Sequence, residues 1–476
     1  MYDVIIIGAG VIGSFIAHAL CRYQLNLLVL EKESDVGSEA SMANSAIIHS
    51  GYDPLPHTNK AKFNVKGNAI YDQICQDLDV PFERIGSLTL AFSKEEEKTL
   101  YELVKRGQEN GVTCQILSGD EVRKLEPHIS KEVVAALFAP TAGIINPFLL
   151  TAHLMEHATD HGTQLHLCEK VVDIEYQDGI YEVKTEKGLY QTRAVINAAG
   201  VYADEITSFL TNPDYQMTPR KGEYFVLEHF DSSFLHHTLF TLPTEKGKGV
   251  LISPTTSQNY LVGPSSEPSN RDDFSTDSIT LEQIKKQAER MMDHIPFQET
   301  IRVFSGVRPT ASKHDFIIEE EKEYPRFIEV AGIESPGLAS APAIAEEVVS
   351  LLKSRMELVE KKEYVATIRP YVVMKNLTAE EKKKKIQENP LYGKMICHCE
   401  QISEQEIRDL FHRSFVPHSI IAIKKRVRAG FGKCQGGMCQ PLLIKIMAEE
   451  LHLPPTEICY HGPHSEILKY PSKEEK

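Results

Sequence analysis

The sequence predicts an α/β fold of mixed sheets, in which a Rossmann-type dinucleotide-binding domain is interleaved with a second, β-rich domain and followed by a small helical module. Three observations predict it. An apolar run at the start of the chain leads into a glycine-rich turn, β-rich segments gather between residues 220 and 320, and two close pairs of cysteines lie near the end. With 476 residues, 42% of them hydrophobic, the chain is long enough for two or three domains and a large buried core.

The first βαβ unit carries a nucleotide-binding pattern. Residues 4–7 are all apolar, residues 11–21 have the period of an amphipathic helix, and residues 26–30 form a second apolar run. The stretch "GAGVIG" between the first strand and the helix fits G-x-G-x-x-G, and Glu31 ends the second strand close to the spacing of ~20 residues expected for an acid on the ribose.

Each residue of the pattern has a physical role. Gly8 allows the tight turn, Gly10 lets the backbone approach a pyrophosphate, and Gly13 lets the helix and strand pack closely. The helix N-terminus supplies positive potential to the phosphates, and Glu31 binds the ribose hydroxyls. These residues predict a bound adenine dinucleotide, and the glycines alone leave NAD and FAD open.

Charge and hydropathy exclude several classes of partner. A formal net charge of -15 would repel nucleic acid, and the lysine run in "EEKKKK" is mixed with acids as on a solvated helix face. No uninterrupted apolar run approaches the ~18 residues that span a bilayer, so we expect no direct membrane insertion. The chain opens on an apolar strand instead of a basic leader and an apolar signal region, which favours a cytoplasmic protein.

Four of the nine cysteines are clustered. Cys397 and Cys399 form Cys-x-Cys, and after 34 intervening residues Cys434 and Cys439 form Cys-x4-Cys. In a reducing cytosol such pairs indicate metal ligands rather than disulfides, and zinc is the alternative to an iron-sulfur cluster. The spacing resembles the bacterioferritin-associated ferredoxin type of domain, which implies a 2Fe-2S cluster in a small helical module.

The residues around the second pair suit such a cluster. Glycines in "GKCQGGMCQP" leave backbone N–H groups free to donate to sulfur, and a helix beginning at Cys439 turns its positive end towards an anionic cluster. Arg426 and Arg428 either balance the charge of the cluster or dock a partner. The tail after the module contains Cys459, which has no neighbouring cysteine in the sequence.

Residues 1–355 resemble the large FAD-dependent family that includes D-amino-acid oxidase, glycine oxidase, flavin-linked glycerol-3-phosphate dehydrogenase and L-2-hydroxyglutarate dehydrogenase. The matching stretches are "DVIIIGAGVIG", "LEKESDVGSEASMANSAIIHSGY", "INAAGVYAD", "KGEYFVL", "GVRP" and "AGIESPGLASAP". The resemblance implies FAD as the cofactor. It places along the pyrophosphate and flavin the residues Ser38, Ser41, Asn44 and Ser45. It places Ala199 and Gly200 where bare backbone approaches the cofactor. It places beside the flavin ring the residues Gly332, Gly337 and Leu338.

The expected domain boundaries follow these motifs. The FAD-binding part is discontinuous, and the substrate domain is inserted into it. The expected ranges are roughly 1–90, 140–215 and 325–355 for the FAD-binding part, roughly 85–140 and 216–325 for the substrate domain, 356–390 for a linker, 391–455 for the 2Fe-2S module and 456–476 for a tail.

Candidate catalytic residues also follow from the resemblance. His49 occupies the position of an active-site histidine in the glycerol-3-phosphate and 2-hydroxyglutarate relatives, and a near-neutral imidazole there can accept the hydroxyl proton of the substrate. Arg308 matches a substrate-contacting arginine whose planar fork suits a carboxylate or phosphate. Arg220, Lys221 and Tyr224 lie on or beside a strand that lines the substrate cavity in the family.

These residues predict a dehydrogenase for a small anionic hydroxy compound, with electrons leaving through the cluster to a protein or quinone-linked acceptor. Two signals about the substrate disagree. "HSGYDP" lacks the phosphate-binding arginine of many glycerol-3-phosphate enzymes, whereas the appended cysteine module is familiar from anaerobic members of that group. Glycerol 3-phosphate is the favoured substrate, followed by L-2-hydroxyglutarate and then an amino acid. An oxidase with a purely structural metal module and an electron-transfer or regulatory subunit are the alternatives.

Overall fold

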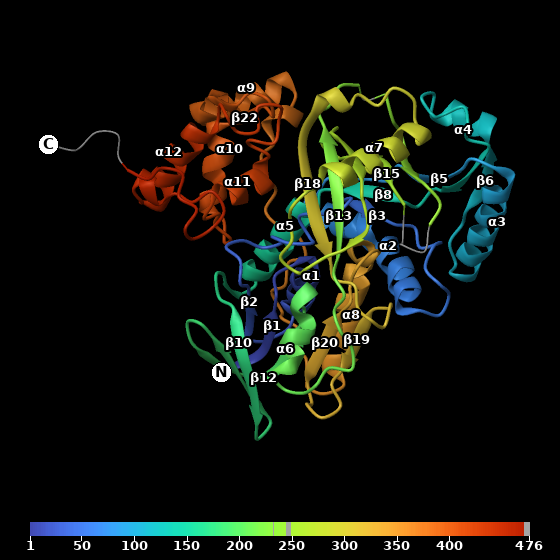
Figure 1. The fold of residues 1–476 in the computed structure, drawn as a ribbon. Coiled ribbons are helices and arrows are strands. Elements are labelled where there is room, and N and C mark those ends of the chain that lie inside the picture. Colours follow the sequence, from blue (N-terminus) through green and yellow to red (C-terminus); the bar gives the residue numbers. More distant parts are fainter. Residues whose placement is uncertain (232, 244–248, 471–476) are drawn as a thin grey trace.

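The computed structural model describes residues 1–231, 233–243 and 249–470 (Figure 1). The last six residues of the expected tail and short parts of the expected substrate domain lie outside these ranges. The chain folds into two large mixed sheets and a small C-terminal module beside them. No helix in the described ranges is long and apolar enough to cross a membrane.

The first sheet contains the dinucleotide-binding unit. Its order is β10-β11-β12-β1-β2-β9, and β20 joins β12 with β19 on its outer side. Strands β1, β2, β9, β12 and β20 are parallel. The strands are β1 (Tyr2–Ile7), β2 (Leu27–Leu30), β9 (Gln164–His166), β10 (Val171–Gln177), β11 (Ile180–Thr185), β12 (Leu189–Asn197), β19 (Ile317–Glu320) and β20 (Phe327–Ala331).

The central parallel strands are continuous apolar runs because helices cover them. Every residue of β2 and of β20 is buried. The α1, α5 and α8 helices share one hydrophobic core with β1 and β2, and α2 packs on α8. The helices of this domain are α1 (Val11–Leu20), α2 (Asn59–Asp77), α5 (Pro147–Asp160), α6 (Ala203–Ser208) and α8 (Gly337–Lys353).

The second sheet is interleaved with the first in the sequence. Its order is β17-β13-β16-β15-β14-β5-β7-β6, and the long β18 pairs with β13. Its strands are β5 (Ser87–Ala91), β6 (Gln115–Ser118), β7 (Ala135–Ala139), β13 (Arg220–Leu227), β14 (Thr238–Phe240), β15 (Leu251–Pro254), β16 (Tyr260–Gly263), β17 (Glu267–Pro268) and β18 (Thr300–Arg308). The helices of this domain are α3 (Lys94–Glu109), α4 (Gly119–Leu125) and α7 (Ser278–Met291).

A three-stranded sheet joins the two domains. It consists of β3 (Ile47–Ile48), β4 (Phe82–Glu83) and β8 (Gly143–Ile145), in the order β3-β8-β4. Strand β19 falls within the range expected for the substrate domain, but it pairs with β20 in the first sheet. The chain therefore returns to the first domain before residue 325.

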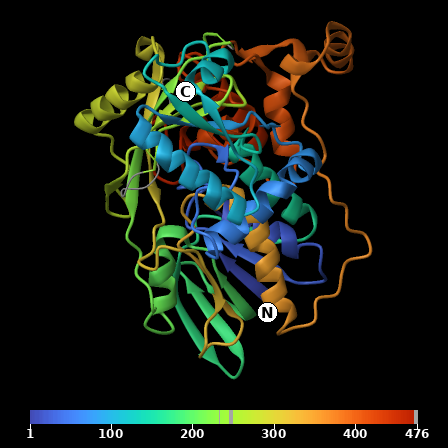
Figure 2. The same cartoon turned by 90° about the vertical axis from the view of Figure 1, so that its right-hand side faces the viewer.

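A connector leads from α8 to the C-terminal module. Figure 2 shows it as an extended trace that leaves the lower end of α8 and runs along the side of the first domain to α9 (Ala379–Glu388). A capping box at Thr378 and Glu381 starts α9, and none of its residues is buried, as the charged sequence predicts. The module has its own core and contains β21 (Met395–Cys397), β22 (Ile402–Ser403), α10 (Glu404–Asp409), α11 (Ile420–Val427) and α12 (Gln440–Leu451).

Candidate functional site

The glycine turn between β1 and α1 is built for close approach. Gly8 has φ +98°, and a Cβ on it would lie 2.6 Å from the carbonyl oxygen of Ala198. A Cβ on Gly13 would lie 2.0 Å from the carbonyl oxygen of Gly8, so the helix can pack on the turn only without one. Gly10 is the N-cap of α1 and has no side-chain cap, which leaves the positive end of the helix towards the cavities that it lines.

Glu31 lies at the end of β2, as predicted, and borders a cavity of about 130 Å³. Its carboxylate accepts hydrogen bonds from the N–H groups of Ala9 (2.7 Å) and Glu33 (2.9 Å). Burial raises the pKa of Glu31 to about 7. Ala199 and Gly200, whose φ is +58°, line the same cavity. The turn, the acid and the bare backbone thus surround a space suited to the adenosine part of a dinucleotide.

The loop after β2 continues towards a larger cavity. Ser41 Oγ accepts a hydrogen bond from the N–H of Val11 (2.8 Å), which ties this loop to the first turn of α1. Asn44 holds its own loop, donating to the carbonyl oxygens of Ala40 and Ser41 and accepting from the N–H of Ala46. Ser38 differs from the other predicted loop residues, because it borders the smaller cavity and not the larger one.

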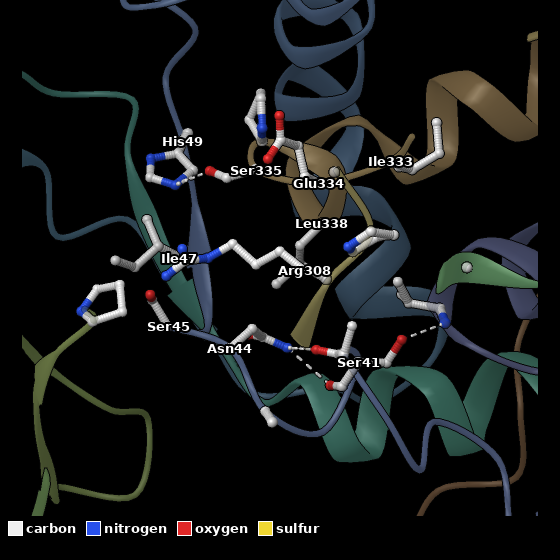
Figure 3. A pocket seen from close by; sticks show the side chains of 18 of the residues that line it. Ser41, Asn44, Ser45, Ile47, His49, Arg308, Ile333, Glu334, Ser335 and Leu338 are labelled. Atoms are coloured by element: carbon white, nitrogen blue, oxygen red, sulfur yellow. Dashed lines mark hydrogen bonds between the residues drawn. The ribbon is translucent and has the colours of Figure 1, made fainter. Parts of the chain in front are cut away.

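The larger cavity, of about 470 Å³, lies where the two domains meet (Figure 3). The first domain contributes the loop at Asn44–His49 and the segment at Ser335–Leu338, and the second sheet contributes side chains of β13 and β18. Gly337 and Leu338, predicted to lie beside a flavin ring, line it at the start of α8. Cavities at domain interfaces with a few convergent polar groups are the usual place for a ligand.

Arg220 and Arg308 face each other on this cavity. They are directly opposite on β13 and β18. Arg220 donates to the hydroxyl and carbonyl oxygens of Ser266 (3.0 and 2.6 Å), and Arg308 donates to the Ser266 hydroxyl (3.2 Å) and to the carbonyl oxygen of Ser265 (2.8 Å). In the part of the chain that the structure describes, neither guanidinium has a carboxylate partner. Two adjacent cations without a counter-charge favour an anion in the cavity.

Gly222 makes room for this arrangement and was missed by the sequence reasoning. A Cβ on Gly222 would lie 2.3 Å from Nη2 of Arg308. Two residues further along the strand, Tyr224 stacks on Phe304 of β18 with ring centres 4.8 Å apart, and its hydroxyl lies 2.9 Å from Ser45 Oγ. The hydroxyl pair therefore joins the substrate-domain wall to the loop of the first domain.

His49 lies on the first-domain wall of the cavity. Figure 3 shows its imidazole facing Ser335, and Nε2 is 3.4 Å from Ser335 Oγ. The ring packs against Phe240 with centres 5.7 Å apart. The backbone carbonyl of His49 accepts hydrogen bonds from the side chains of Asn64 (2.7 Å) and Asn68 (3.0 Å) on α2, which fixes the backbone beneath the imidazole.

Lys221 and Gly332, predicted for the substrate site and the flavin ring, do not line the cavity. Lys221 lies between Arg220 and Gly222, and the alternation of a strand turns its side chain to the opposite face, where Nζ is 2.8 Å from Asp273. Gly332 has φ +69°, and a Cβ there would meet Ala311 at 2.9 Å. Its lack of a side chain serves packing against the neighbouring segment, and its place beside the flavin stays a prediction.

Lys60 and Glu334 also line the cavity and were not predicted. Lys60 Nζ is 2.7 Å from the Glu334 carboxylate, which also accepts a hydrogen bond from Thr310 Oγ1 (2.7 Å). The two residues are 274 positions apart in the chain. No local motif marks Lys60 at the start of α2, and the neighbouring glycines of "GIESPG" were the only signal for Glu334.

The four clustered cysteines form two close pairs. The Sγ atoms of Cys399 and Cys434 are 3.8 Å apart, and the thiol of Cys439 hydrogen-bonds with Cys397. Within the described ranges no three of the four sulfurs lie within 4.8 Å of one another. The four thiolates of one tetrahedral zinc, with Zn–S ~2.3 Å, would all be about 3.8 Å apart. Two separate pairs fit two irons, each held by one pair.

The surroundings lower the pKa of one cysteine in each pair, Cys397 and Cys434, and raise the pKa of its neighbour, Cys439 and Cys399. The hydrogen bond with Cys439 lowers the pKa of Cys397 to about 6, and the backbone N–H of Met438 lowers the pKa of Cys434. A Cβ on Gly432 would lie 2.3 Å from Cβ of Cys399, so this position beside a ligand requires glycine. Helix α12 begins directly after Cys439, as expected.

The two arginines beside the second loop make contacts within the chain. Arg426 pairs with Asp35 of the first domain, and Arg428 with Glu400 of the module, at 2.9 and 2.8 Å. Arg428 also donates to Asn259 Oδ1 (2.9 Å) in the second domain. Both side chains are therefore occupied in docking the module on its own chain.

Comparison with known proteins identifies the class that this fold and site define. Residues 3–351 match the family described as FAD dependent oxidoreductase, and residues 395–449 match the BFD-like 2Fe-2S binding domain. The chain belongs to the FAD dependent oxidoreductase family and carries a C-terminal 2Fe-2S domain. It is an FAD-dependent enzyme whose cofactors are FAD and a 2Fe-2S cluster.

The similar proteins resemble this chain in sequence as well as in fold. A glycerol 3-phosphate dehydrogenase of Caloramator mitchellensis is 43% identical over 100% of both chains. A glycerol 3-phosphate oxidase of Mycoplasma genitalium is 34% identical over 75% of this chain and 95% of its own. Among solved structures, an FAD-bound L-alpha-glycerophosphate oxidase of Mycoplasma pneumoniae superposes with a TM-score of 0.75 at 32% identity, covering 78% of this chain and 99% of that one.

Proposed function

We propose that this enzyme is a glycerol 3-phosphate dehydrogenase that forms dihydroxyacetone phosphate and passes the electrons through its cluster to a protein acceptor. The observation that carries the proposal is the pair of guanidinium groups of Arg220 and Arg308, which face one cavity without a carboxylate partner among the described residues. The Caloramator relative, similar over its whole length, supports the same substrate.

The residues of the cavity have separate roles in binding, orienting and deprotonating the substrate. Arg220 and Arg308 bind the phosphate and fix one end of the substrate, because planar guanidinium groups pair well with phosphate oxygens. Tyr224 and Ser45, already joined by a hydrogen bond, orient the polyol part between the two walls. His49, on the opposite wall, accepts the proton of the hydroxyl that is oxidised, and Ser335 orients its imidazole through Nε2.

The cofactors supply the redox chemistry. The glycine turn and the loop at Ser41–Ser45 would hold FAD, which would supply the hydride-accepting chemistry. The cluster, held by Cys397, Cys399, Cys434 and Cys439, supplies one-electron transfer, which favours a dehydrogenase with a protein acceptor over an oxidase. The module remains partly open for such a partner, since Cys399 and the neighbouring Met438 are exposed.

A substrate comparison under anaerobic conditions tests the proposal. Reduction of an artificial dye by the holoenzyme should be much faster with glycerol 3-phosphate than with glycerol, which lacks the phosphate, or with L-2-hydroxyglutarate, which carries carboxylates instead. Equal rates with glycerol would remove the anion site from the mechanism. A higher kcat/KM with L-2-hydroxyglutarate would assign the same cavity to a dicarboxylate.

A further inference from the structure

The substrate cavity carries a third cation, whose charge an acid of the same cavity already neutralises. Among the residues that the structure describes, the charged side chains lining this cavity are Asp53, Lys60, Arg220, Arg308 and Glu334. Lys60 Nζ lies 2.7 Å from the Glu334 carboxylate, whereas the two arginines donate to serine oxygens. Within this set of side chains, uncompensated positive charge is therefore confined to the arginine pair.

Two segments of the chain hold the Glu334 side chain in place. One carboxylate oxygen accepts a hydrogen bond from Lys60 at the start of α2, and the other accepts one from Thr310 Oγ1 (2.7 Å), two residues after Arg308. Lys60 Nζ also donates to the carbonyl oxygen of His314 (2.9 Å). The side chains of Lys60 and Glu334 are only 18% and 19% exposed, so water and salt screen this pair less than they screen a surface pair.

The Glu334 carboxylate lies on the wall of the proton acceptor. Glu334 directly precedes Ser335, whose Oγ is 3.4 Å from Nε2 of His49. Figure 3 shows Glu334 and Ser335 together on the side of the cavity where the imidazole lies. A group bonded to the carbon that is oxidised also has to lie beside His49, because the hydroxyl on that carbon gives its proton to the imidazole. Such a group therefore meets a wall that carries a negative charge.

We propose that Glu334 selects against a carboxylate on the carbon that is oxidised and so determines the substrate specificity of this site. In a 2-hydroxy acid the carboxylate is bonded directly to that carbon, and Glu334 both repels it and holds Lys60, the cation that would pair with it. Glycerol 3-phosphate has a neutral hydroxymethyl group there, whose hydroxyl donates to Glu334, since each carboxylate oxygen can accept two hydrogen bonds. The inference rests on the proposed function, because it requires Arg220 and Arg308 to bind the other end of the substrate.

Anaerobic dye reduction by the Glu334→Gln holoenzyme, with glycerol 3-phosphate and L-2-hydroxyglutarate compared, tests the inference. The amide keeps the size of the side chain, removes its charge and releases Lys60. The ratio of kcat/KM for glycerol 3-phosphate to kcat/KM for L-2-hydroxyglutarate should therefore fall about tenfold or more, the effect of relieving a like-charge contact. The matched control is Glu347→Gln, because the ion pair of Glu347 with Lys62 (3.2 Å) joins α8 to α2 outside the cavity. FAD and iron content are measured for each variant, so that loss of a cofactor is not mistaken for a change in specificity.

A second variant should shift the specificity in the opposite direction. Lys60→Met leaves the Glu334 carboxylate without its counter-charge, so the same ratio should rise. Binding of 2-oxoglutarate, followed by the change in flavin absorbance without turnover, should be stronger in Glu334→Gln and weaker in Lys60→Met than in the wild type.

The outcomes separate this inference from the proposed function. The inference alone is overturned if the wild type prefers glycerol 3-phosphate while Glu334→Gln has the ratio and the 2-oxoglutarate affinity of Glu347→Gln. If Glu334→Gln proves unstable, an unchanged or lower ratio in Lys60→Met overturns it. A wild type that prefers L-2-hydroxyglutarate with Glu334 intact would overturn the proposed substrate as well.

Discussion

The guanidinium of Arg426 donates to both carboxylate oxygens of Asp35, at 3.1 and 2.9 Å, and so joins the cluster module to the FAD-binding domain. Both side chains are almost fully buried. The adjacent Lys425 donates to the carbonyl oxygen of Val36 (3.1 Å) and to Ser38 Oγ (3.2 Å). The module therefore holds the start of the loop that continues to Ser41 and the two cavities.

Removing one partner of this ion pair should release the module. Arg426→Met leaves the buried Asp35 carboxylate with Lys425 alone, 3.4 Å away, and removal of one partner from a buried ion pair typically costs about 3–5 kcal/mol. We expect a lower free energy of unfolding in urea and faster proteolysis of the connector. Lys433→Met is the control, because its ion pair with Glu299 also joins the module to the body but is exposed. Equal stability of Arg426→Met and the wild type would show that the pair does not hold the module.

The ion pair between Asp35 and Arg426 should stop stabilising the docked module at low pH. Burial alone would raise the pKa of Asp35, but Arg426 and Lys425 hold it below its ordinary value. Its contribution to stability is therefore present above the unfolded pKa of about 3.9 and is lost as the pH falls through the folded value.

Glu329 should make the FAD-binding domain less stable at higher pH. Burial raises its pKa to about 7, and its carboxyl group meets Thr207, Tyr215 and Asn197. The unfolded value is about 4.3, so the stabilising effect is complete below that pH and is lost as the pH rises through about 7. Between about pH 5 and pH 8 this group should remove about 2–3 kcal/mol from the free energy of unfolding. Glu329→Gln should flatten that dependence, and an unchanged slope would assign it to other groups.

Replacement of either cavity arginine by lysine should weaken substrate binding. Arg308→Lys and Arg220→Lys lose the planar fork, so KM for glycerol 3-phosphate should rise about tenfold or more with a smaller effect on kcat. Lys221→Met is a control on the same strand, because its side chain lies on the other face. Steady-state dye reduction measures both constants. Saturation of Arg308→Lys at the same glycerol 3-phosphate concentration as the wild type would contradict the role of Arg308 in binding the phosphate.

Loss of the imidazole of His49 should affect the chemical step. His49→Ala should lower kcat by about 10²–10⁴-fold, the usual contribution of a general base, while KM changes little. Ser335→Ala should have a smaller effect of the same kind, because the hydroxyl only orients the ring. His412→Ala, at a histidine whose side chain is 67% exposed, is the control. A wild-type rate of substrate oxidation by His49→Ala would exclude this histidine as the proton acceptor.

Local spacing carried most of the correct predictions. The roles of Gly8 and Gly13 in the turn depend on atoms a few residues away or on the adjacent strand, and the structure shows the contacts that exclude a Cβ. The helix that begins after Cys439 is likewise encoded by neighbouring residues, whereas the structure pairs Cys399 with Cys434 across 35 positions. Such features can be predicted because the sequence itself fixes the distances involved.

Features that depend on tertiary contacts could be predicted less well from the sequence. Arg220 and Lys221 are adjacent basic residues, and the sequence does not say which of two neighbours on a strand faces the cavity. Lys60 meets Glu334, and Asp35 meets Arg426, only after distant segments pack together. Gly332 matched a family motif, yet its missing side chain is explained by contact with Ala311.

The central claim is that the electrons of glycerol 3-phosphate reach the cluster of this chain. The most direct test is an anaerobic titration of the holoprotein with glycerol 3-phosphate, followed by flavin absorbance and by electron paramagnetic resonance of the reduced 2Fe-2S cluster. We predict that flavin bleaching is accompanied by the cluster signal, and that Cys399→Ser retains the bleaching and loses the signal. Flavin bleaching in the wild type with a cluster that stays oxidised would contradict the account and assign the module a structural role.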